Sequence, residues 1–101
     1  MIEITFNGKT FDLQITGHAE GADKVCASVS ALTYTLASAL ETLGDGCKVE
    51  STIENGNGHI KAKAKKGYAG NVALMYHTIL CGYEGLANSY PEQIKFVVVG
   101  G

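Results

Sequence analysis

Apolar and polar residues alternate with a period of two in five short segments of the chain, which is the pattern of half-buried β-strands. In the first segment Ile2, Ile4 and Phe6 alternate with polar residues, and the dipeptide Asn7-Gly8 that follows is a strong hairpin signal. A turn rich in Asn and Gly over residues 54–58 separates two further segments. The predicted strands cover residues 2–6, 11–15, 49–53, 59–65 and 94–98.

Two longer segments repeat their apolar residues at steps of three and four, which predicts amphipathic helices. The first runs from about residue 24 to residue 43, and Gly44 follows where a helix C-terminus favours a positive φ. The second starts between Gly67 and Gly70, and Pro91 ends it because proline cannot continue the hydrogen-bond ladder.

The order of these elements is ββαββαβ, which predicts an α+β fold with a mostly antiparallel sheet and two helices packed on one face. No repeat or linker divides the chain, so residues 1–101 are expected to form a single domain. The last strand is apolar on both faces, because Val97 and Val99 alternate with the apolar residues Ile94, Phe96 and Val98. An edge strand of this kind invites pairing, so we expect a partner surface, most simply a homodimer.

Composition and charge narrow the possible partners. Apolar residues make up 46% of the chain and charged residues 18%, and the net charge is −2, so no direct binding of nucleic acid through a broad basic surface is expected. Lys61, Lys63 and Lys65 alternate with alanines and so mark the solvent face of a strand. No segment approaches the roughly 18 apolar residues of a membrane span, and the start lacks signal-peptide character, so we expect no membrane and a cytoplasmic location.

Metal and cofactor sites are not indicated. His59 and His77 lack the paired spacing that zinc ligands usually show, so neither a metal nor another cofactor is expected. Cys47 and Cys81 are interpreted as structural, since cysteines of a cytoplasmic protein rarely form a disulfide scaffold. Three tyrosines of the second helix are spaced seven apart and indicate core or dimer packing, whereas Tyr68, just before that helix, is the tyrosine expected to line a substrate groove. The three are Tyr76, Tyr83 and Tyr90.

The candidate chemistry lies between the second strand and the first helix. His18 follows the strand and Cys26 falls in the first helical turn, so a short loop can bring an imidazole beside a thiol, the minimum equipment for cysteine catalysis. Asp23 is a candidate N-cap for the N–H of Cys26. The helix dipole favours the thiolate and the negative charge of Asp23 opposes it, so the net effect on the thiol stays open. Ser30 and Thr33 share the helical face of Cys26 and either serve the site or cover the helix surface.

Both residues also have ordinary interpretations. A cysteine in a first helical turn is commonly a small buried hydrophobe, and a histidine beside glycine is commonly a loop residue. If the two do act together, the backbone N–H groups of Cys26 and Ala27 are candidates for an oxyanion hole.

The motif Gly17-His18-Ala19, followed by the run from Asp23 to Ser30 (Asp-Lys-Val-Cys-Ala-Ser-Val-Ser), resembles the signature of the ribosomal-processing cysteine protease family Prp, or YsxB-like domain. The resemblance implies a protease that removes the N-terminal extension of the large-subunit ribosomal protein numbered twenty-seven, and a dimer. It implies a catalytic dyad of His18 and Cys26, with Asp23 and Ser30 in supporting positions.

One feature departs from the family. Many members have a longer, glycine-rich loop between the two motifs that covers the site, whereas here Glu20, Gly21 and Ala22 form a compact loop. Two other classes of function remain as alternatives: a noncatalytic peptide-binding or assembly module on the ribosome, and a thiol-based redox or acyl-transfer enzyme. The lack of a second cysteine nearby in the sequence counts against a dithiol cycle.

Overall fold

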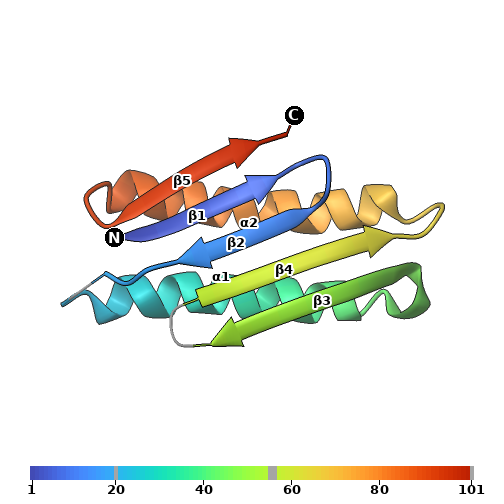
Figure 1. Cartoon of the computed structure of the whole chain (residues 1–101), viewed down its shortest axis with the longest axis horizontal. Helices are drawn as coiled ribbons and strands as arrows, with labels where there is room; N and C mark the ends of the chain where they lie inside the picture. Colours follow the sequence, from blue (N-terminus) through green and yellow to red (C-terminus); the bar gives the residue numbers. More distant parts are fainter. Residues whose placement is uncertain (20, 55–56, 101) are drawn as a thin grey trace.

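The computed structural model describes residues 1–19, 21–54 and 57–100, and it confirms the α+β class and the ββαββαβ order (Figure 1). The elements are β1 (Ile2–Asn7), β2 (Asp12–Thr16), α1 (Asp23–Glu41), the short 3-10 helix η1 (Gly44–Gly46), β3 (Cys47–Glu54), β4 (Asn57–Ala64), α2 (Ala69–Ser89) and β5 (Ile94–Val99).

The five strands form one sheet in the order β3-β4-β2-β1-β5. All neighbours are antiparallel except β1 and β5, which run parallel because α2 carries the chain back across the sheet between β4 and β5. β3 and β5 are therefore the two edge strands. The apolar last strand is at an edge, as predicted, and its Val97, Val98 and Val99 are exposed.

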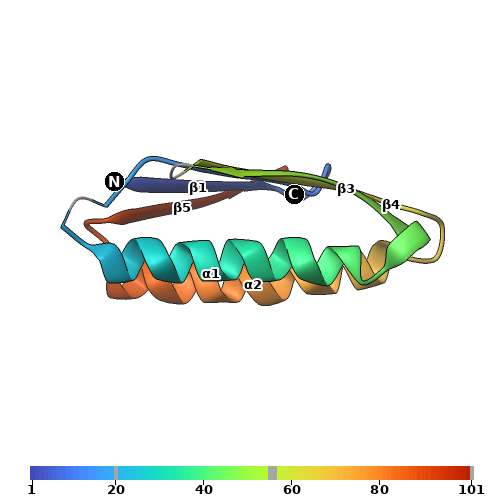
Figure 2. The same ribbon diagram turned by 90° about the horizontal axis from the view of Figure 1, so that it is seen from below.

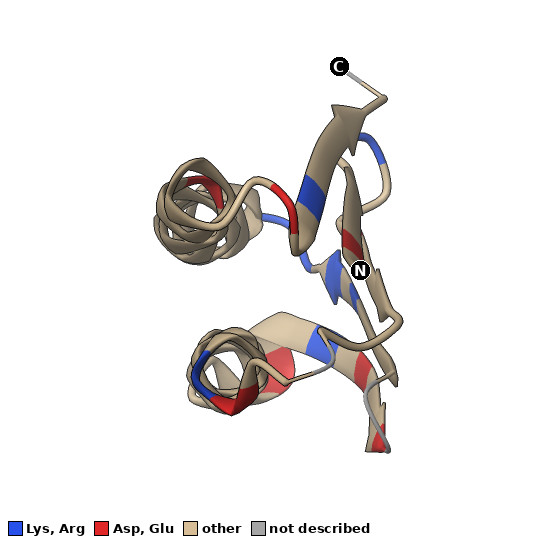
Figure 3. Cartoon of the chain, turned by 90° about the vertical axis from the view of Figure 1, so that its left-hand side faces the viewer, with Lys and Arg blue, Asp and Glu red and all other residues tan. Residues whose placement is uncertain are grey.

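Both helices cover the same face of the sheet (Figures 2 and 3). Period-two alternation along each strand places apolar side chains toward the helices and polar ones on the open face. The predicted lysine stripe is confirmed for Lys61 and Lys63, which are exposed on β4 and alternate with the buried Ile60 and Ala62. Lys65 is also exposed but lies after the strand, which ends at Ala64. In the part of the chain that the structure describes, neither helix combines the length and apolar character that crossing a membrane requires.

Two buried tyrosines of α2 tie the layers together. Tyr83 is fully buried, and its hydroxyl lies 2.7 Å from that of Thr33 on α1. Since Thr33 Oγ1 donates to the Val29 carbonyl at 2.7 Å, Tyr83 is the donor to Thr33. Tyr76 donates to the Phe11 carbonyl at 2.7 Å, and burial raises its pKa. The predicted core role is thus confirmed for Tyr76 and Tyr83, whereas Tyr90 lies after the helix and is 40% exposed.

Several predicted boundaries were wrong by one or two residues. The second strand begins after Phe11, whose positive φ of 52° belongs to the turn. The first helix ends at Glu41, although Gly44 has the expected positive φ of 55°. The turn over residues 54–58 is shorter than predicted, because Asn57 pairs with Glu54; its central residues 55 and 56 lie outside the described parts.

The connection from β2 to α1 depends on Gly17. Its φ of +91° is a conformation that side chains other than glycine rarely adopt, and a Cβ added there would lie 2.2 Å from the Met1 carbonyl oxygen. Gly67 has the same φ of +91°, but nothing lies within 4 Å of its added Cβ. Gly17 therefore meets two constraints, and Gly67 meets only one.

We expect the stability of the protein to fall as the pH rises between 10.0, the ordinary tyrosine pKa, and about 12, the value to which burial raises the pKa of Tyr83. In this window the unfolded chain releases the tyrosine proton and the folded chain keeps it, so the free energy of unfolding decreases by about 1.4 kcal/mol per pH unit per tyrosine. Tyr83→Phe should reduce the dependence of the unfolding free energy on pH, as measured by urea titrations at several pH values. Part of this dependence should remain in the variant, because burial also raises the pKa of Tyr76. Equal slopes in wild type and Tyr83→Phe, with the exposed Tyr34→Phe as control, would contradict this prediction.

We expect Gly17→Ala to destabilise the protein more than Gly67→Ala. The control variant carries only the cost of a left-handed alanine, about 1–2 kcal/mol. Gly17→Ala adds the collision with Met1, which is worth a further ~1–3 kcal/mol if the strand end has to move. Urea unfolding of both variants measures the difference. Equal losses of unfolding free energy in the two variants would contradict this prediction, because they would show that Met1 moves away from the added methyl group without destabilising the protein.

Candidate active site

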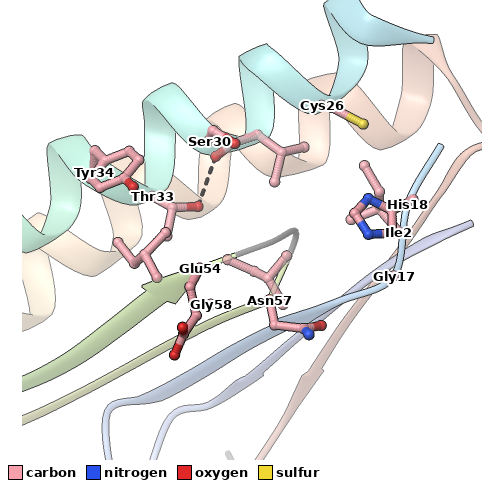
Figure 4. A pocket seen from close by; sticks show the side chains of 13 residues that line it. Ile2, Gly17, His18, Cys26, Ser30, Thr33, Tyr34, Glu54, Asn57 and Gly58 are labelled. Carbon is pink, nitrogen blue, oxygen red and sulfur yellow. Dashed lines mark hydrogen bonds between the residues drawn. The ribbon is translucent and has the colours of Figure 1, made fainter. Parts of the chain in front are cut away.

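His18 and Cys26 open into one cavity of about 260 Å³ between the start of α1 and the end of the sheet (Figure 4). Cys26 reaches it from the first turn of α1, and His18 reaches it from the segment that follows β2. The sulfur of Cys26 points from the helix toward the side of the cavity on which His18 lies. The full lining comprises Ile2, Ile15, Gly17, His18, Cys26, Val29, Ser30, Thr33, Tyr34, Ile53, Glu54, Asn57 and Gly58.

The thiol of Cys26 is half-buried and rests against the loop that precedes the helix. Its Sγ donates a long hydrogen bond of 3.8 Å to the Ala19 carbonyl, and Ala22 N–H donates to the same oxygen at 3.1 Å. The backbone N–H of Cys26 donates to the Ala22 carbonyl at 3.2 Å. In this conformation the hydrogen-bond partner of the Cys26 thiol is therefore the backbone carbonyl of Ala19.

His18 is exposed, and its backbone is fixed more firmly than its ring. The backbone nitrogen of Met1 donates to the His18 carbonyl at 2.7 Å. Among the hydrogen bonds of residues 1–19, 21–54 and 57–100, none joins the His18 ring to the sulfur of Cys26. Catalytic hydrogen bonds are often long in structures without substrate and tighten when substrate binds. The two groups share a cavity, with space between them for a reacting group.

Asp23 is not the N-cap of α1, and that prediction was wrong. Ala22 is the cap residue, with φ −125° and ψ 61°, and no side chain caps the helix. Asp23 is already the first helical residue, so its carboxylate is not in the N-cap position from which it would accept a hydrogen bond from the Cys26 N–H. It is exposed, and it is not among the residues that line the cavity.

Ser30 and Thr33 both line the cavity, in agreement with their helical spacing from Cys26. Ser30 is exposed to solvent. Thr33 is buried, and its hydroxyl is already hydrogen-bonded to the Val29 carbonyl and the Tyr83 hydroxyl. Thr33 consequently presents its methyl group to neighbouring atoms; its Cγ2 would lie 3.5 Å from a Cβ added at Gly58.

Residues of the sheet complete the cavity, and the sequence alone did not identify them. Ile15, Ile53 and Gly58 come from β2, β3 and β4, which are adjacent in the sheet but distant in the sequence. Tyr34 was also missed, although its spacing of four from Ser30 is a usable signal. The expectation that Tyr68 lines the groove was wrong, since its ring packs on Gly46 at the opposite end of α1.

The loop between the two motifs is described only in part. Gly21 has a positive φ of 70°, Ala22 is half-buried, and neither lines the cavity, while Glu20 lies outside the described residues. A role for this loop over the site stays a prediction.

Among the described residues, Tyr34 and Glu54 are the other titratable side chains that line the cavity, whereas the remaining histidines and cysteines do not. His59 Nε2 is 2.6 Å from Asp12 Oδ1 on the open face of the sheet. Cys47 is buried, which raises its pKa, whereas Cys81 is exposed on α2 rather than packed in the core. Within the described ranges no three His, Cys, Asp or Glu side chains lie close enough to hold a metal ion. Cys26 is therefore the thiol that lines this cavity, together with the imidazole of His18, whereas Cys81 and His77 of α2 line a separate cavity with Glu84.

Solved structures share this fold over almost the whole chain. The crystal structure of SMU.848 from Streptococcus mutans has 27% sequence identity and a TM-score of 0.74, and it covers 97% of this chain and 91% of its own. The ribosomal processing protease Prp from S. aureus, solved with a covalently linked product peptide, has 24% identity, a TM-score of 0.75 and 97% coverage of both chains. The same protease with a substrate peptide has 23% identity, a TM-score of 0.72 and the same coverage.

Sequence comparison gives the family directly. No curated protein matches the chain. Residues 1–95 match the model of the family described as cysteine protease Prp, which includes both motifs and nearly the entire fold. The chain therefore belongs to the Prp family of cysteine proteases.

Proposed function

We propose that this protein is a cysteine endopeptidase that removes the N-terminal extension of a large-subunit ribosomal protein, the one numbered twenty-seven, during ribosome assembly in the cytoplasm. The observation that carries the proposal is the cavity in which a helix N-terminal thiol, Cys26, and an imidazole, His18, meet from two different elements. Membership of the Prp family supports the reaction class. The S. aureus relative, a ribosomal processing protease solved with substrate and product peptides, supports the substrate class.

In the proposed mechanism His18 accepts the proton of Cys26, and the thiolate attacks the carbonyl carbon of the scissile peptide bond. Cys26 lies in the first turn of α1, at the positive end of the helix dipole, and Asp23 places a negative charge in the same turn. His18 then gives its proton to the leaving amine as the carbon–nitrogen bond breaks. Water then attacks the carbonyl carbon of the thioester and gives a proton to His18. The carbon–sulfur bond breaks, the N-terminal extension leaves with a new carboxyl terminus, and His18 returns the proton to the sulfur.

We propose the backbone N–H groups of Cys26 and Ala27 as oxyanion donors, with Ser30 as a hydroxyl donor at the cavity wall. The Cys26 N–H already donates to the Ala22 carbonyl at 3.2 Å, so its use requires the first turn of α1 to adjust when substrate binds. Asp23 remains a candidate for support of the site through its charge in the first turn rather than through a cap.

A noncatalytic peptide-binding module is the second candidate, and the missing hydrogen bond between His18 and Cys26 favours it. A dithiol redox enzyme has less support, because within the described residues Cys47 and Cys81 do not line the cavity.

We expect wild-type protein to shorten the full-length ribosomal protein of the source organism at one N-terminal site, and Cys26→Ala to abolish this cleavage while the fold is kept. His18→Ala should lower kcat/KM by about 10²–10⁴-fold, the usual contribution of a general base. Intact-mass analysis of the substrate after incubation measures both effects. Cys81→Ala is the matched control, because it removes an exposed thiol far along α2.

Cleavage by pure Cys26→Ala would contradict the nucleophile assignment. Unchanged activity of His18→Ala would place the base elsewhere. Tight peptide binding without any turnover by the wild type would favour the noncatalytic module.

We also propose a homodimer through β5. This edge strand exposes Val97, Val98 and Val99 on its two faces, an apolar surface that association would bury. Val98→Lys should convert the dimer to a monomer in analytical ultracentrifugation, because a charge buried at the interface is costly. Lys95→Ala is the control on the same strand; a dimer that persists in Val98→Lys would contradict this interface.

A further inference from the structure

We propose that the backbone N–H of Gly17 binds the substrate, by donating a hydrogen bond to a main-chain carbonyl oxygen of the peptide beside the scissile bond. The proposal rests on the proposed function and specifies how the chain holds its substrate. Gly17 directly precedes His18, and both residues line the cavity together with Cys26 (Figure 4). A carbonyl group bound at Gly17 is therefore placed next to the residue that carries the candidate base.

The hydrogen-bond pattern of the sheet fixes the direction of this N–H. Successive residues of a strand direct their backbone groups to opposite sides. The N–H of Ile2 donates to the Gln93 carbonyl beside β5, so the next residue, Glu3, directs its backbone groups to β2. Its partner there is Thr16, whose C=O consequently points to β1. Because the peptide bond is planar and trans, the N–H of Gly17 points opposite to that C=O, away from β1.

A second hydrogen bond gives the same direction. The Phe11 carbonyl accepts from the N–H of Ala62 on β4, so every second residue after Phe11, Gly17 included, faces the β4 side of β2. The positive φ of Gly17 rotates only the atoms that follow its nitrogen, so it leaves the direction of the N–H unchanged.

On the β4 side of Gly17 the neighbouring strand has already ended. The pairing of β2 with β4 stops at Ile15 and Gly58, and β4 begins at Asn57. Gly17 is half-buried, and its N–H donates to no atom of residues 1–19, 21–54 and 57–100. Backbone N–H groups that are shielded from water are nearly always paired in folded proteins. This donor is consequently available to an acceptor that enters the cavity.

The N–H groups at the start of α1 are in a different state. The Cys26 N–H donates to the Ala22 carbonyl at 3.2 Å, and the Ala22 N–H donates to the Ala19 carbonyl at 3.1 Å. A substrate can use either group only if the first turn of the helix rearranges, whereas the Gly17 N–H needs no such change. Because every peptide residue has a carbonyl oxygen, this donor fixes the position of the substrate main chain and leaves the selection of side chains to the cavity walls.

The test removes this donor and keeps every side chain. Cys26 permits ligation of a synthetic peptide of residues 1–25, with glycolic acid at position 17, to residues 26–101. The amide between Thr16 and Gly17 becomes an ester, which has no N–H and still permits the φ of +91°. For a peptide that spans the cleavage site, we expect the Gly17 ester to raise KM about 10-fold and to leave kcat within about twofold of wild type.

The matched control carries glycolic acid at Gly8, in the turn at the other end of β1. The Gly8 N–H donates to the Val99 carbonyl at 2.9 Å, and Gly8 does not line this cavity. The Gly8 ester should therefore have wild-type kcat and KM, but it should unfold at a lower urea concentration than the Gly17 ester. Equal losses of stability in the two esters would show that the Gly17 N–H has a partner within the chain, and would overturn the proposal.

Thioamide substitution of the peptide identifies the acceptor, because a thiocarbonyl sulfur is a weaker acceptor than a carbonyl oxygen. At one position beside the scissile bond the thioamide should raise KM for the wild type and have no further effect on the Gly17 ester. Effects that add at every position would overturn the proposal. A lower kcat of the Gly17 ester with unchanged KM would also overturn it, because the N–H would then stabilise the developing oxyanion and not bind the substrate.

Failure of this inference can be separated from failure of the proposed function. If the wild type cleaves the peptide and the Gly17 ester cleaves it equally well, the protease assignment stands and the role of Gly17 is wrong. If neither cleaves, the comparison is repeated on the dissociation constant of a fluorescent peptide that corresponds to the first residues of the ribosomal protein. Weaker binding to the Gly17 ester supports the donor without catalysis, equal binding overturns it, and absence of binding overturns both proposals.

Discussion

The candidate site depends on one constraint, which is the short connection between β2 and α1. Residues 17–22 have to carry the chain from the end of the sheet to the start of a helix on its buried face. At no more than about 3.6 Å per residue, this segment cannot move the helix N-terminus far from the strand end. His18 and Cys26 are consequently confined to the same corner of the molecule. The left-handed Gly17 makes the turn possible, and its close approach to Met1 anchors the turn to β1.

The one-sided cover of the sheet explains where the remaining surfaces lie. The two helices bury one face of the sheet. The hydrogen bond from Tyr83 to Thr33 fixes α2 against α1, and the hydrogen bond from Tyr76 to the Phe11 carbonyl fixes α2 against the turn between β1 and β2. The two edges then differ in character. The β3 edge borders the cavity beside α1, whereas the β5 edge is apolar and distant from it. A homodimer through β5, as proposed, would therefore leave the cavity open.

Features that depend on neighbours in the sequence were predictable, and features that depend on strand order were not. Period-two and period-3.6 patterns identified the five strands and both α-helices of the described residues but not the short helix η1, and the loop length alone predicted that His18 lies near Cys26. The cavity walls from Ile53 and Gly58 could not be anticipated, because nothing in the sequence shows that β4 inserts between β2 and β3. Tyr68 was misplaced for the same reason. Asp23 was misassigned because a cap depends on the backbone dihedrals of one residue, which the type of residue favours but does not determine.

The state of the Cys26 thiol shows what substrate binding has to accomplish. In the structure the sulfur makes a long hydrogen bond to the Ala19 carbonyl, whereas the proposed mechanism needs it as the attacking thiolate. Among the described residues the Cys26 sulfur is bonded to the Ala19 carbonyl and not to the His18 ring, although it points toward that side of the cavity, so the proposed proton transfer requires the two groups to come closer. Under the proposed function, a substrate that fills the cavity between these groups would exclude water from it. Exclusion of water strengthens the attraction between a thiolate and an imidazolium, so substrate binding and activation of the nucleophile would be coupled.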